Sequence, residues 1–332
     1  MVVGNRNPVL LSDRVLVVRQ GATLRYILAP VHAIERSSTA EFHPLANMLT
    51  PAMSPRLVKL RSENDAFQHA ETLSKNRTRR QKHRKFFVEG VKTIEQALTN
   101  EWKVDAIYYA GDVELSSFAR NVLGRSTARE HFELPSRMFE KLRWSSKMEK
   151  RSELIALIEM PPEDLSRISV KQNSLIVVFD RPSSFGNLGT IIRTCEAFGA
   201  DGLVITGHAV DLYDPQTVRA SMSSLFSVPI VRLPSHQEVQ DWSDGVRKQF
   251  PEFRLVGSSA RGAQDVQTYQ FQGPLALVVG NETHGLSMNY MKICDAVVRI
   301  PMFGSATSLN VASASAILLY EINRQRAQTE SG

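Results

Sequence analysis

Apolar positions in residues 173–332 form two alternating kinds of segment. Short apolar runs rich in β-branched residues, which are typical of strands buried on both faces, occur at 175–179, 203–206, 254–257, 275–279 and 297–300. Between them, apolar residues recur every three or four positions and predict helices at 188–198, 214–224, 235–250 and from 310 onward. A further strand is expected at 226–231. Strands that alternate with helices predict an α/β domain with a parallel sheet.

The segment 175–207 is a strand, a polar loop, a helix and a second strand. Its helix has one apolar face, made of Leu188, Ile191, Ile192, Cys195 and Phe198, and Gly199 ends it. Arg193 interrupts this pattern shortly after the polar loop. An arginine near the ligand edge of a parallel sheet can meet a phosphate with its planar fork of donors. A solvated surface arginine is the alternative, and the segment alone leaves both open.

Residues 55–160 carry shorter elements of the same alternating kind. Strands are expected at 86–88, 104–110, 132–134 and 154–158, and helices at 66–73, 91–102, 118–123 and 136–142, the last capped by Ser136. This pattern predicts a small α/β domain. Pro161 and Pro162 open a charged linker, 161–172. Residues 1–54 have no sustained periodicity. We interpret them as an N-terminal extension, partly disordered, with short strands at 15–18 and 26–28 and no assigned function.

A basic segment without acidic residues separates the first of these helices from strand 86–88. Its cations are Lys75, Arg77, Arg79, Arg80, Lys82, Arg84 and Lys85. A positive cluster beside aromatic residues is typical of a surface that binds phosphates, and a solvated charged loop is the alternative. Because no acid compensates the charge, we favour RNA contacts by Arg77, Arg79, Arg80, Lys82, Arg84 and Lys85.

Composition narrows the class of partner. The 332 residues have a formal net charge of +6 and a pI near 9.4, which favours an anionic partner such as nucleic acid. No apolar run is long enough to span a bilayer. The two cysteines, Cys195 and Cys294, predict buried free thiols, with neither a disulfide nor a metal site. The start is a poor secretory signal, so we expect a cytoplasmic protein. Its arginine-rich, acid-poor character leaves the mitochondrial matrix as the alternative.

Three loops at strand ends, 182–193, 280–286 and 300–310, are expected to converge at one edge of the sheet. Gly280 and Gly285 allow close approach of the backbone to a ligand. Ser308 and Asn310 stand where a helix begins and either cap it or contact the ligand. The apolar residues between them suit a nucleoside with an apolar tail. No G-x-x-x-x-G-K-[ST] or G-x-G-x-x-G motif is present, which argues against a P-loop nucleotidase and a dinucleotide enzyme.

These loops resemble the motifs of the SpoU (TrmH-type) group of SPOUT RNA 2′-O-ribose methyltransferases. Motif one, N-x-G-x-x-x-R, matches 187–193, and motif two, G-[NS]-E-x-x-G-[LI], matches 280–286. Motif three, I-P-M followed by S-L-N-V-[AS], matches 300–302 and 308–312. Residues 56–158 are similar to the L30e-like substrate-binding domain of the family, chiefly through KNRTRRQKHRKFFVEG. One departure is Ser184-Phe185, where many members have Asp-Pro.

The resemblance implies a SPOUT-type α/β domain (173–332) with a C-terminal trefoil knot, preceded by a small L30e-like domain (55–160). It implies S-adenosylmethionine as cofactor, a homodimer, and 2′-O-ribose methylation of rRNA, with tRNA as the alternative substrate. Two other classes stay open. One is a catalytically inactive RNA-binding SPOUT protein, and the other is a methyltransferase that acts on protein or a small molecule.

The resemblance also assigns roles to residues. It implies that Arg193 is catalytic, that Asn187 supports it and that Glu282 is the motif-two acid; a helix N-cap is the alternative for Asn187. The implied cofactor-binding residues are Ser258, Ser259, Ala260, Gly280, Ile300, Met302, Ser308, Leu309 and Asn310. Because a guanidinium is effectively always protonated, we expect Arg193 to clamp an RNA phosphate rather than act as a base. The phosphate or a water would then accept the 2′-hydroxyl proton.

Overall fold

The computed structural model describes residues 16–20, 23–27, 55–144 and 152–330. The chain divides into two units, Met1–Ala52 and Met53–Gly332. In the first unit, β1 (Leu16–Gln20) and β2 (Thr23–Ile27) form an antiparallel pair, slightly displaced from the two expected strands. The rest of the predicted extension, with its expected disorder, lies outside the described residues.

The second unit begins with a five-stranded sheet, which we call the five-stranded region. Its strands are β3 (Arg56–Lys59), β4 (Lys85–Glu89), β5 (Val104–Ala110), β6 (Glu130–Leu134) and β7 (Leu154–Glu159), in the order β3-β6-β5-β7-β4. Strand β7 runs antiparallel to both of its neighbours. The helices are α1 (Asp65–Lys75), α2 (Arg77–His83), α3 (Val91–Thr99), α4 (Ser117–Arg125) and α5 (Ser136–Leu142). This sheet falls within the predicted α/β region 55–160.

Two local predictions in this region are wrong. The basic segment was expected only to separate the helix at 66–73 from the strand at 86–88. It forms α2 instead, with the Asn76 side chain as N-cap accepting a hydrogen bond from Arg79 N at 3.0 Å. Periodicity missed this helix because only one of its residues, Arg80, is buried. Ser136 is not the N-cap of α5, which follows Pro135. Its backbone N and hydroxyl donate instead to Asp112, at 2.7 and 3.0 Å.

The seven-stranded region follows, and every strand pair in it is parallel, as predicted. Its strands are β8 (Leu175–Asp180), β9 (Gly202–Thr206), β10 (Ile230–Leu233), β11 (Arg254–Ser258), β12 (Gln264–Asp265), β13 (Leu275–Val279) and β14 (Ala296–Arg299), in the order β10-β9-β8-β13-β11-β14-β12. Its helices are α6 (Phe185–Ala197), α7 (Pro215–Ala220), α8 (His236–Arg247), α9 (Met288–Ile293) and α10 (Val311–Glu330). The threading that would make a trefoil knot stays a prediction.

The strand and helix expected between β9 and α8 differ from those observed. Asp214 is the N-cap of α7 and Pro215 its first residue, as predicted, but the helix ends at Ala220 instead of 224. A 3₁₀ turn at Ser224–Phe226 and β10 at Ile230–Leu233 replace the strand expected at 226–231. The apolar run was therefore assigned too early, because residues 225, 226 and 228 are buried without belonging to a strand.

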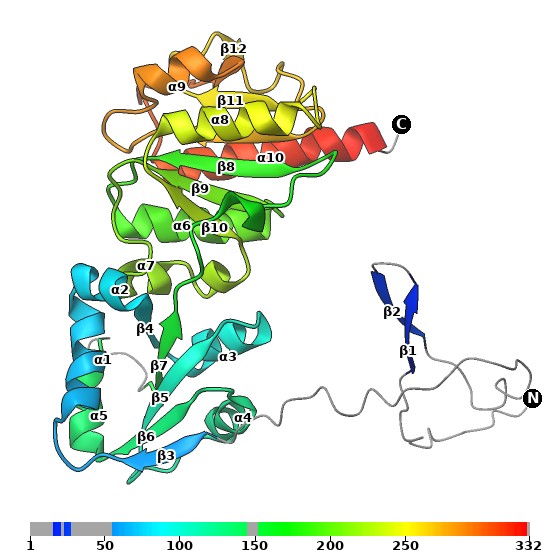
Figure 1. The fold of residues 1–332 in the computed structure, drawn as a ribbon. Coiled ribbons are helices and arrows are strands. Elements are labelled where there is room, and N and C mark those ends of the chain that lie inside the picture. The colour runs from blue at the N-terminus through cyan, green and yellow to red at the C-terminus, as the bar shows by residue number, and fades with distance from the viewer. Residues whose placement is uncertain (1–15, 21–22, 28–54, 145–151, 331–332) are drawn as a thin grey trace, which may run out of the picture. The chain divides into compact units, whose positions relative to one another are not determined.

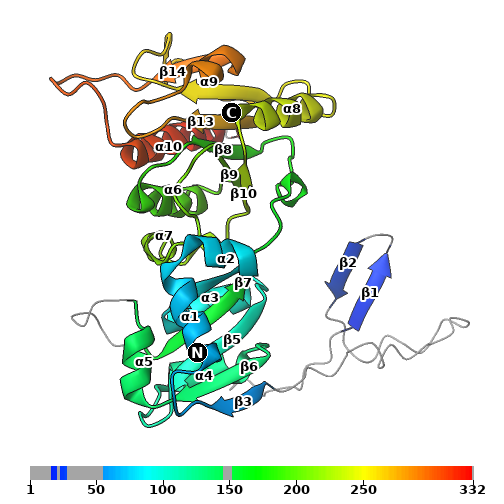
Figure 2. The same ribbon diagram turned by 60° about the vertical axis from the view of Figure 1, so that its left-hand side comes forward.

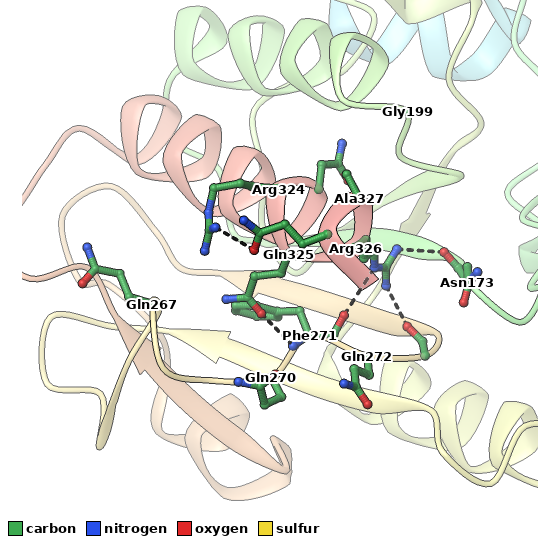
Figure 3. A pocket seen from close by; sticks show the side chains of 13 residues that line it. Asn173, Gly199, Gln267, Gln270, Phe271, Gln272, Arg324, Gln325, Arg326 and Ala327 are labelled. Atoms are coloured by element: carbon green, nitrogen blue, oxygen red, sulfur yellow. Dashed lines mark hydrogen bonds between the residues drawn. The ribbon is translucent and has the colours of Figure 1, made fainter. Parts of the chain in front are cut away.

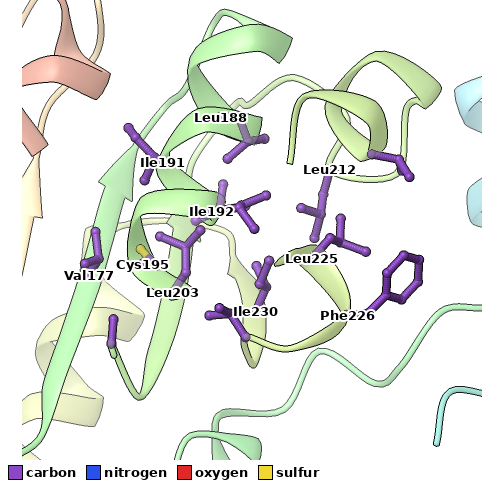
Figure 4. Packing of buried hydrophobic residues seen from close by; sticks show 14 of the residues in the cluster. Val177, Leu188, Ile191, Ile192, Cys195, Leu203, Leu212, Leu225, Phe226 and Ile230 are labelled. Atoms are coloured by element: carbon purple, nitrogen blue, oxygen red, sulfur yellow. The ribbon is translucent and has the colours of Figure 1, made fainter. Parts of the chain in front are cut away.

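Apolar side chains cover both faces of the seven-stranded sheet. Leu188, Ile191 and Ile192 of α6 pack toward Leu203 and Ile230 of the strands (Figure 4). Helix α10 packs beside α6 on the same face, while α8 and α9 cover the other face. Figures 1 and 2 show α7 between the seven-stranded sheet and α2 of the five-stranded region. One continuous apolar cluster joins the two regions.

Both cysteines are free thiols, as predicted; Cys195 is buried and Cys294 partly buried. Burial raises the pKa of each thiol to about 12, so both are unreactive at neutral pH. In the described ranges no helix combines the length and apolarity that a membrane crossing requires. The same residues contain no group of three metal-ligating side chains.

Candidate active site

The carboxyl edge of the seven-stranded sheet brings the predicted loops together. Strand β13 lies between β8 and β11, so the loops after Asp180 and Val279 leave neighbouring strands. Ser258 at the end of β11 pairs with Val298 of β14, which leads into the loop 300–310. The parallel sheet therefore gathers the three motif segments at one edge.

The carboxylate of Glu282 joins the second loop to the first. Its Oε2 accepts hydrogen bonds from Ser183 N at 2.9 Å and Ser183 Oγ at 2.7 Å. Its Oε1 accepts from Ser184 N at 3.0 Å and Asn187 Nδ2 at 3.3 Å. Burial alone would raise the pKa of Glu282, but the hydrogen bonds from Ser183 and Ser184 outweigh it and hold this pKa below its usual value. Glu282 is therefore an ionised anchor at neutral pH.

Asn187 joins the first loop to the third. Its Oδ1 accepts a hydrogen bond from Asn310 Nδ2 at 3.0 Å, while its own amide donates to Glu282. Asn310 also caps α10, since its Oδ1 accepts from Ala312 N at 2.9 Å. The structure thus brings together one member of each motif, Asn187, Glu282 and Asn310.

The N-cap alternative for Asn187 is wrong. Helix α6 begins at Phe185, and its N-cap is Ser184, whose hydroxyl accepts from Asn187 N at 3.3 Å. Serine is a strong N-cap, so Ser184 satisfies one backbone amide at the start of α6.

Two motif glycines are required by close packing. A Cβ on Gly280 would lie 2.2 Å from both Gly285 C and Leu286 N, where the backbone pair between Asn281 and Gly285 closes the loop. A Cβ on Gly189 would lie 2.4 Å from the Cβ of Ala220 in α7. Gly189 therefore allows α6 and α7 to approach closely.

Arg193 lies apart from the hydrogen-bonded set. It is six positions beyond Asn187, which is about 9 Å along the helix axis. Its neighbours Ile191 and Ile192 are buried, while Arg193 itself is on the exposed face of α6. Within the part of the chain that the structure describes, its side chain forms no hydrogen bond or ion pair. The guanidinium is thus available to a ligand.

The residues predicted to bind cofactor lie at the same carboxyl edge, with different degrees of exposure. Ser258 is the last residue of β11, Ser259 and Ala260 follow it, and Ser259 N donates to Val298 O at 3.0 Å. Met302 and Leu309 are 37% and 39% exposed. Uncovered apolar side chains beside serine hydroxyls and backbone groups fit a ligand with both apolar and polar parts. Ile300 is partly buried, and Ser308 is exposed.

The cations predicted to contact RNA, in and just after helix α2, fall into two groups: those exposed to solvent and those paired with acidic side chains. Arg77, Arg79, Lys82 and Arg84 are exposed, and Lys85 is partly buried beside Asp105 at 2.6 Å. Arg80 contradicts the prediction, because it is only 1% exposed and pairs with Asp211 and Asp214 at 2.8 and 2.9 Å. Both acids lie more than 130 positions away, so the local charge pattern could not reveal them.

A large cavity of about 830 Å³ lies at the opposite, amino-terminal edge of the sheet (Figure 3). It is lined mainly by amide side chains and by Arg324 and Arg326. Arg326 donates to Asn173 O at 2.8 Å and Gly273 O at 2.7 Å, which tie α10 to the starts of β8 and β13. None of the predicted site residues lines this cavity.

Sequence reasoning left out the side chains that hold the loops in place. Ser183 and Ser184 carry the hydrogen bonds to Glu282 described above. Asn281 donates to Arg181 O at 2.7 Å and accepts from Thr283 N at 2.9 Å. The signal for Ser184 was available, since a serine immediately before the first residue of a helix is a capping pattern. The bond from Asn281 to Arg181 O joins loops 100 positions apart, so it had no local signal.

Sequence comparisons cover both regions of this chain. Residues 174–320 match the SpoU rRNA Methylase family, and residues 64–156 match the SpoU L30e-like domain. The chain is 43% identical over 273 residues to the 23S rRNA (uridine(2479)-2′-O)-methyltransferase of Streptomyces viridochromogenes, covering 82% of this chain and 94% of that protein. It is 28% identical over 245 residues to the 23S rRNA (guanosine(2553)-2′-O)-methyltransferase RlmP of Bacillus subtilis, covering 73% and 90%.

Solved structures show the same similarity. The SpoU methyltransferase AviRb from S. viridochromogenes, in complex with AdoMet, aligns with a TM-score of 0.76 at 43% identity over 80% of this chain and 98% of that one. An AdoMet-bound rRNA methyltransferase from Sinorhizobium meliloti aligns with a TM-score of 0.69 at 28% identity, over 81% and 98%.

Proposed function

This chain belongs to the SpoU rRNA methylase family, and we propose that it methylates a ribose 2′-oxygen of 23S rRNA with S-adenosylmethionine as methyl donor. Its 43% identical relative is a 23S rRNA 2′-O-methyltransferase that the alignment covers almost completely. The observation that supports this activity most directly is the hydrogen-bonded set Asn187, Glu282 and Asn310, one residue from each family motif.

The carboxyl edge fits the cofactor that the family uses. When bound, S-adenosylmethionine supplies an electrophilic methyl group. The residues that would line its site are Ser258, Ile300, Met302 and Leu309. The exposed apolar side chains among them could pack against the methionine and adenine parts of the cofactor. The closed turn that begins at Gly280 presents backbone groups at the same edge.

Arg193 would act on the RNA. Its guanidinium has no protein partner among the described residues and can form a bidentate contact with the phosphate beside the target ribose. This contact orients the 2′-hydroxyl and stabilises the developing oxyanion, while the phosphate or a water accepts the proton. Glu282 is ionised and saturated with hydrogen bonds, so it would hold the loops and would not transfer the proton.

The exposed cations of α2, Arg77, Arg79 and Lys82, would hold the RNA backbone at a distance from the target nucleotide. Contacts of this kind position an RNA without reading its sequence. Choice of the target nucleotide therefore depends on RNA shape and on the residues around Arg193.

We include a homodimer in the proposal. Helix α10 exposes Ile317 by 40% and Tyr320 by 58%, on the face of the sheet where it packs against α6. Exposed large apolar residues beside the catalytic helix suit a subunit interface. Light scattering should give twice the chain mass for the wild type, and Ile317→Glu should shift it toward the monomer. A wild-type monomer at micromolar concentration would contradict this part of the proposal.

Methyl transfer tests the function as a whole. Purified protein, labelled S-adenosylmethionine and protein-free 23S rRNA should give label in RNA that maps to one ribose 2′-oxygen. Bulk tRNA and a protein extract serve as parallel acceptors. Cofactor binding by calorimetry without transfer to any RNA would favour a catalytically inactive RNA-binding protein instead.

A further inference from the structure

We propose that Arg80 is a positioning residue that docks the RNA-binding domain on α7 and thereby aligns bound RNA with Arg193. The inference rests on the proposed function and concerns a residue that the charge pattern had assigned to RNA contact. It connects one short helix, α2, to both the RNA surface and the catalytic helix.

The guanidinium of Arg80 is saturated by protein groups. Its Nε donates to Asp211 Oδ2 at 2.8 Å, and its Nη2 donates to Asp214 Oδ2 at 2.9 Å. Its Nη1 donates to the carbonyls of Leu73 at 2.8 Å and Ser74 at 3.3 Å, at the end of α1. Because Arg80 is 1% exposed, this side chain has no donor left for a phosphate. It therefore acts between protein elements.

Both acids belong to the start of α7. Asp214 is the N-cap of α7, with Oδ1 accepting from Gln216 N at 3.0 Å while Oδ2 accepts from Arg80. The carbonyl of Asp211 accepts from Thr217 Oγ1 at 3.0 Å, inside the first turn. Arg80 thus holds the capped end of α7 against the RNA-binding domain.

Helix α7 is in turn packed tightly on the catalytic helix α6. Gly189 has no room for a Cβ, since one would lie 2.4 Å from the Cβ of Ala220 and 2.8 Å from Ser221 N. Arg193 is one helical turn beyond Gly189, and Asn187 is two residues before it. A shift of α7 is therefore transmitted to the residues that face RNA and the hydrogen-bonded set.

Other faces of α2 carry Arg79 and Lys82, both exposed. Arg77 lies one turn before Arg80 and, like it, reaches the segment before α7, donating from Nη1 to Ala209 O at 2.9 Å. The same seven-residue helix therefore holds RNA on one side and α7 on the other. Removing an arginine and two carboxylates from water costs free energy, so a buried cluster of this kind is weak evidence for added stability. The role best supported for such clusters is to favour one arrangement of the packed elements over others. Trp102 adds a neutral contact across the same boundary, donating from Nε1 to Phe226 O at 3.0 Å.

Two variants separate positioning from folding. Arg80→Lys keeps the charge but loses the planar fork that meets both acids. The triple variant Arg80→Met, Asp211→Asn and Asp214→Asn removes all three charges together, so that no buried charge is left unpaired. Arg79→Ala is the matched control, because it removes the neighbouring exposed cation of the same helix.

Single-turnover methylation of 23S rRNA, RNA affinity and S-adenosylmethionine affinity would be measured for each variant. We expect the Arg80 variants to lower the methylation rate at saturating RNA about 10–100-fold while both affinities stay near those of the wild type. Arg79→Ala should show the opposite pattern, with its main loss in RNA affinity.

Three results would overturn the inference. One is a wild-type rate in both Arg80 variants. Another is a loss confined to RNA affinity, which would make Arg80 an RNA contact. The third is loss of S-adenosylmethionine binding together with the rate, which would make its role one of folding. An inactive wild type that binds S-adenosylmethionine would instead refute the proposed function, independently of Arg80.

Discussion

Helices α2 and α6 each carry an arginine that sequence patterns single out, and the two side chains have opposite environments. Arg80 of α2 is buried and bonded to two carboxylates and two carbonyls. Arg193 of α6 is exposed and has no partner in the described part of the chain. The buried arginine can only organise protein, while the exposed one can meet a ligand. Direct contact of an arginine with a ligand therefore depends on its donors being free, while a saturated arginine can act only by positioning protein elements.

The two helices also differ in what surrounds the arginine. Around the start of α6, Glu282, Asn187 and Asn310 form a network that includes all three family motifs. Around α2, the exposed cations Arg79 and Lys82 take part in no such network among the described residues, and Arg77 donates only to Ala209 O, at 2.9 Å. Single substitutions near α6 should therefore lower the methylation rate strongly, because the side chains there act as one connected set. Single substitutions of the exposed cations of α2 should each weaken RNA binding only slightly.

The largest effect is expected from Arg193→Ala. Losing a positioned donor at a developing oxyanion should lower the methylation rate roughly 10²–10³-fold. S-adenosylmethionine affinity should stay near the wild-type value, because among the described residues the Arg193 side chain forms no hydrogen bond or ion pair with the loops that would hold the cofactor. Calorimetry beside single-turnover kinetics checks this, and equal loss of both would contradict the assigned role.

Arg80→Met should be the most destabilising single change. It leaves the buried Asp211 and the partly buried Asp214 without their counter-charge, and breaking a buried pair in this way typically costs about 3–5 kcal/mol in free energy of unfolding. Urea unfolding measures the loss. The neutralised triple variant should recover much of it, and an equal loss in both variants would show that packing, not charge, is responsible.

Gly189→Ala tests the contact between α7 and α6. The added Cβ meets Ala220 at 2.4 Å and should cost about 1–3 kcal/mol of stability, with a reduced methylation rate. Gly186→Ala in the same helix is the control, since its Cβ would meet nothing closer than Ser184 Oγ at 3.8 Å. That control should be neutral or stabilise by up to about 1 kcal/mol. Equal behaviour of the two variants would refute the close-packing argument.

Glu282→Gln should weaken the loop network by removing its charge-assisted hydrogen bonds, with a rate loss of about tenfold. Because the folded-state pKa of Glu282 is lowered, its stabilising contribution is present above the usual glutamate pKa and disappears as pH falls through the lowered value. The difference in stability between wild type and variant should therefore be constant from pH 5 to 8 and shrink below about pH 4.5. A difference that grows toward acid would contradict the lowered pKa.

The smallest effect is expected from Arg79→Ala. Removing one exposed phosphate contact should weaken RNA binding and reduce the slope of log affinity against log salt by about 1. Filter binding over a salt series measures it. An unchanged slope would place the RNA elsewhere than on α2.

Sequence patterns predicted the parts of the molecule whose signals are local. Buried strands such as Leu175–Asp180 and Leu275–Val279 are continuous apolar runs, and α6 has a clear apolar face. The motif spacing identified the three loops. Their convergence could be predicted as well, because the carboxyl ends of parallel strands lie at one edge of a sheet. Asn187, Glu282 and Asn310 accordingly belong together in the structure as expected.

The errors have a common physical cause, which is pairing over long sequence distances. Helix α2 has one buried residue, so periodicity did not show it, and the partners of Arg80 lie in another region of the chain. Apolar residues at 225–228 pack in the core without a strand ladder. Ser136 donates a hydrogen bond to Asp112, which lies in another loop 24 positions earlier, and does not cap α5. Local patterns do not contain such information.

In the proposed function, the enzyme transfers a methyl group from S-adenosylmethionine to one ribose of 23S rRNA, and the exposed Arg193 holds the phosphate beside that ribose. The most direct test of this role is a map of 2′-O-methyl positions in 23S rRNA from cells that lack the gene, complemented with wild type or Arg193→Ala. We expect one position that is methylated with the wild type and unmethylated with the variant. The same map in all three strains, or methylation restored by Arg193→Ala, would contradict it.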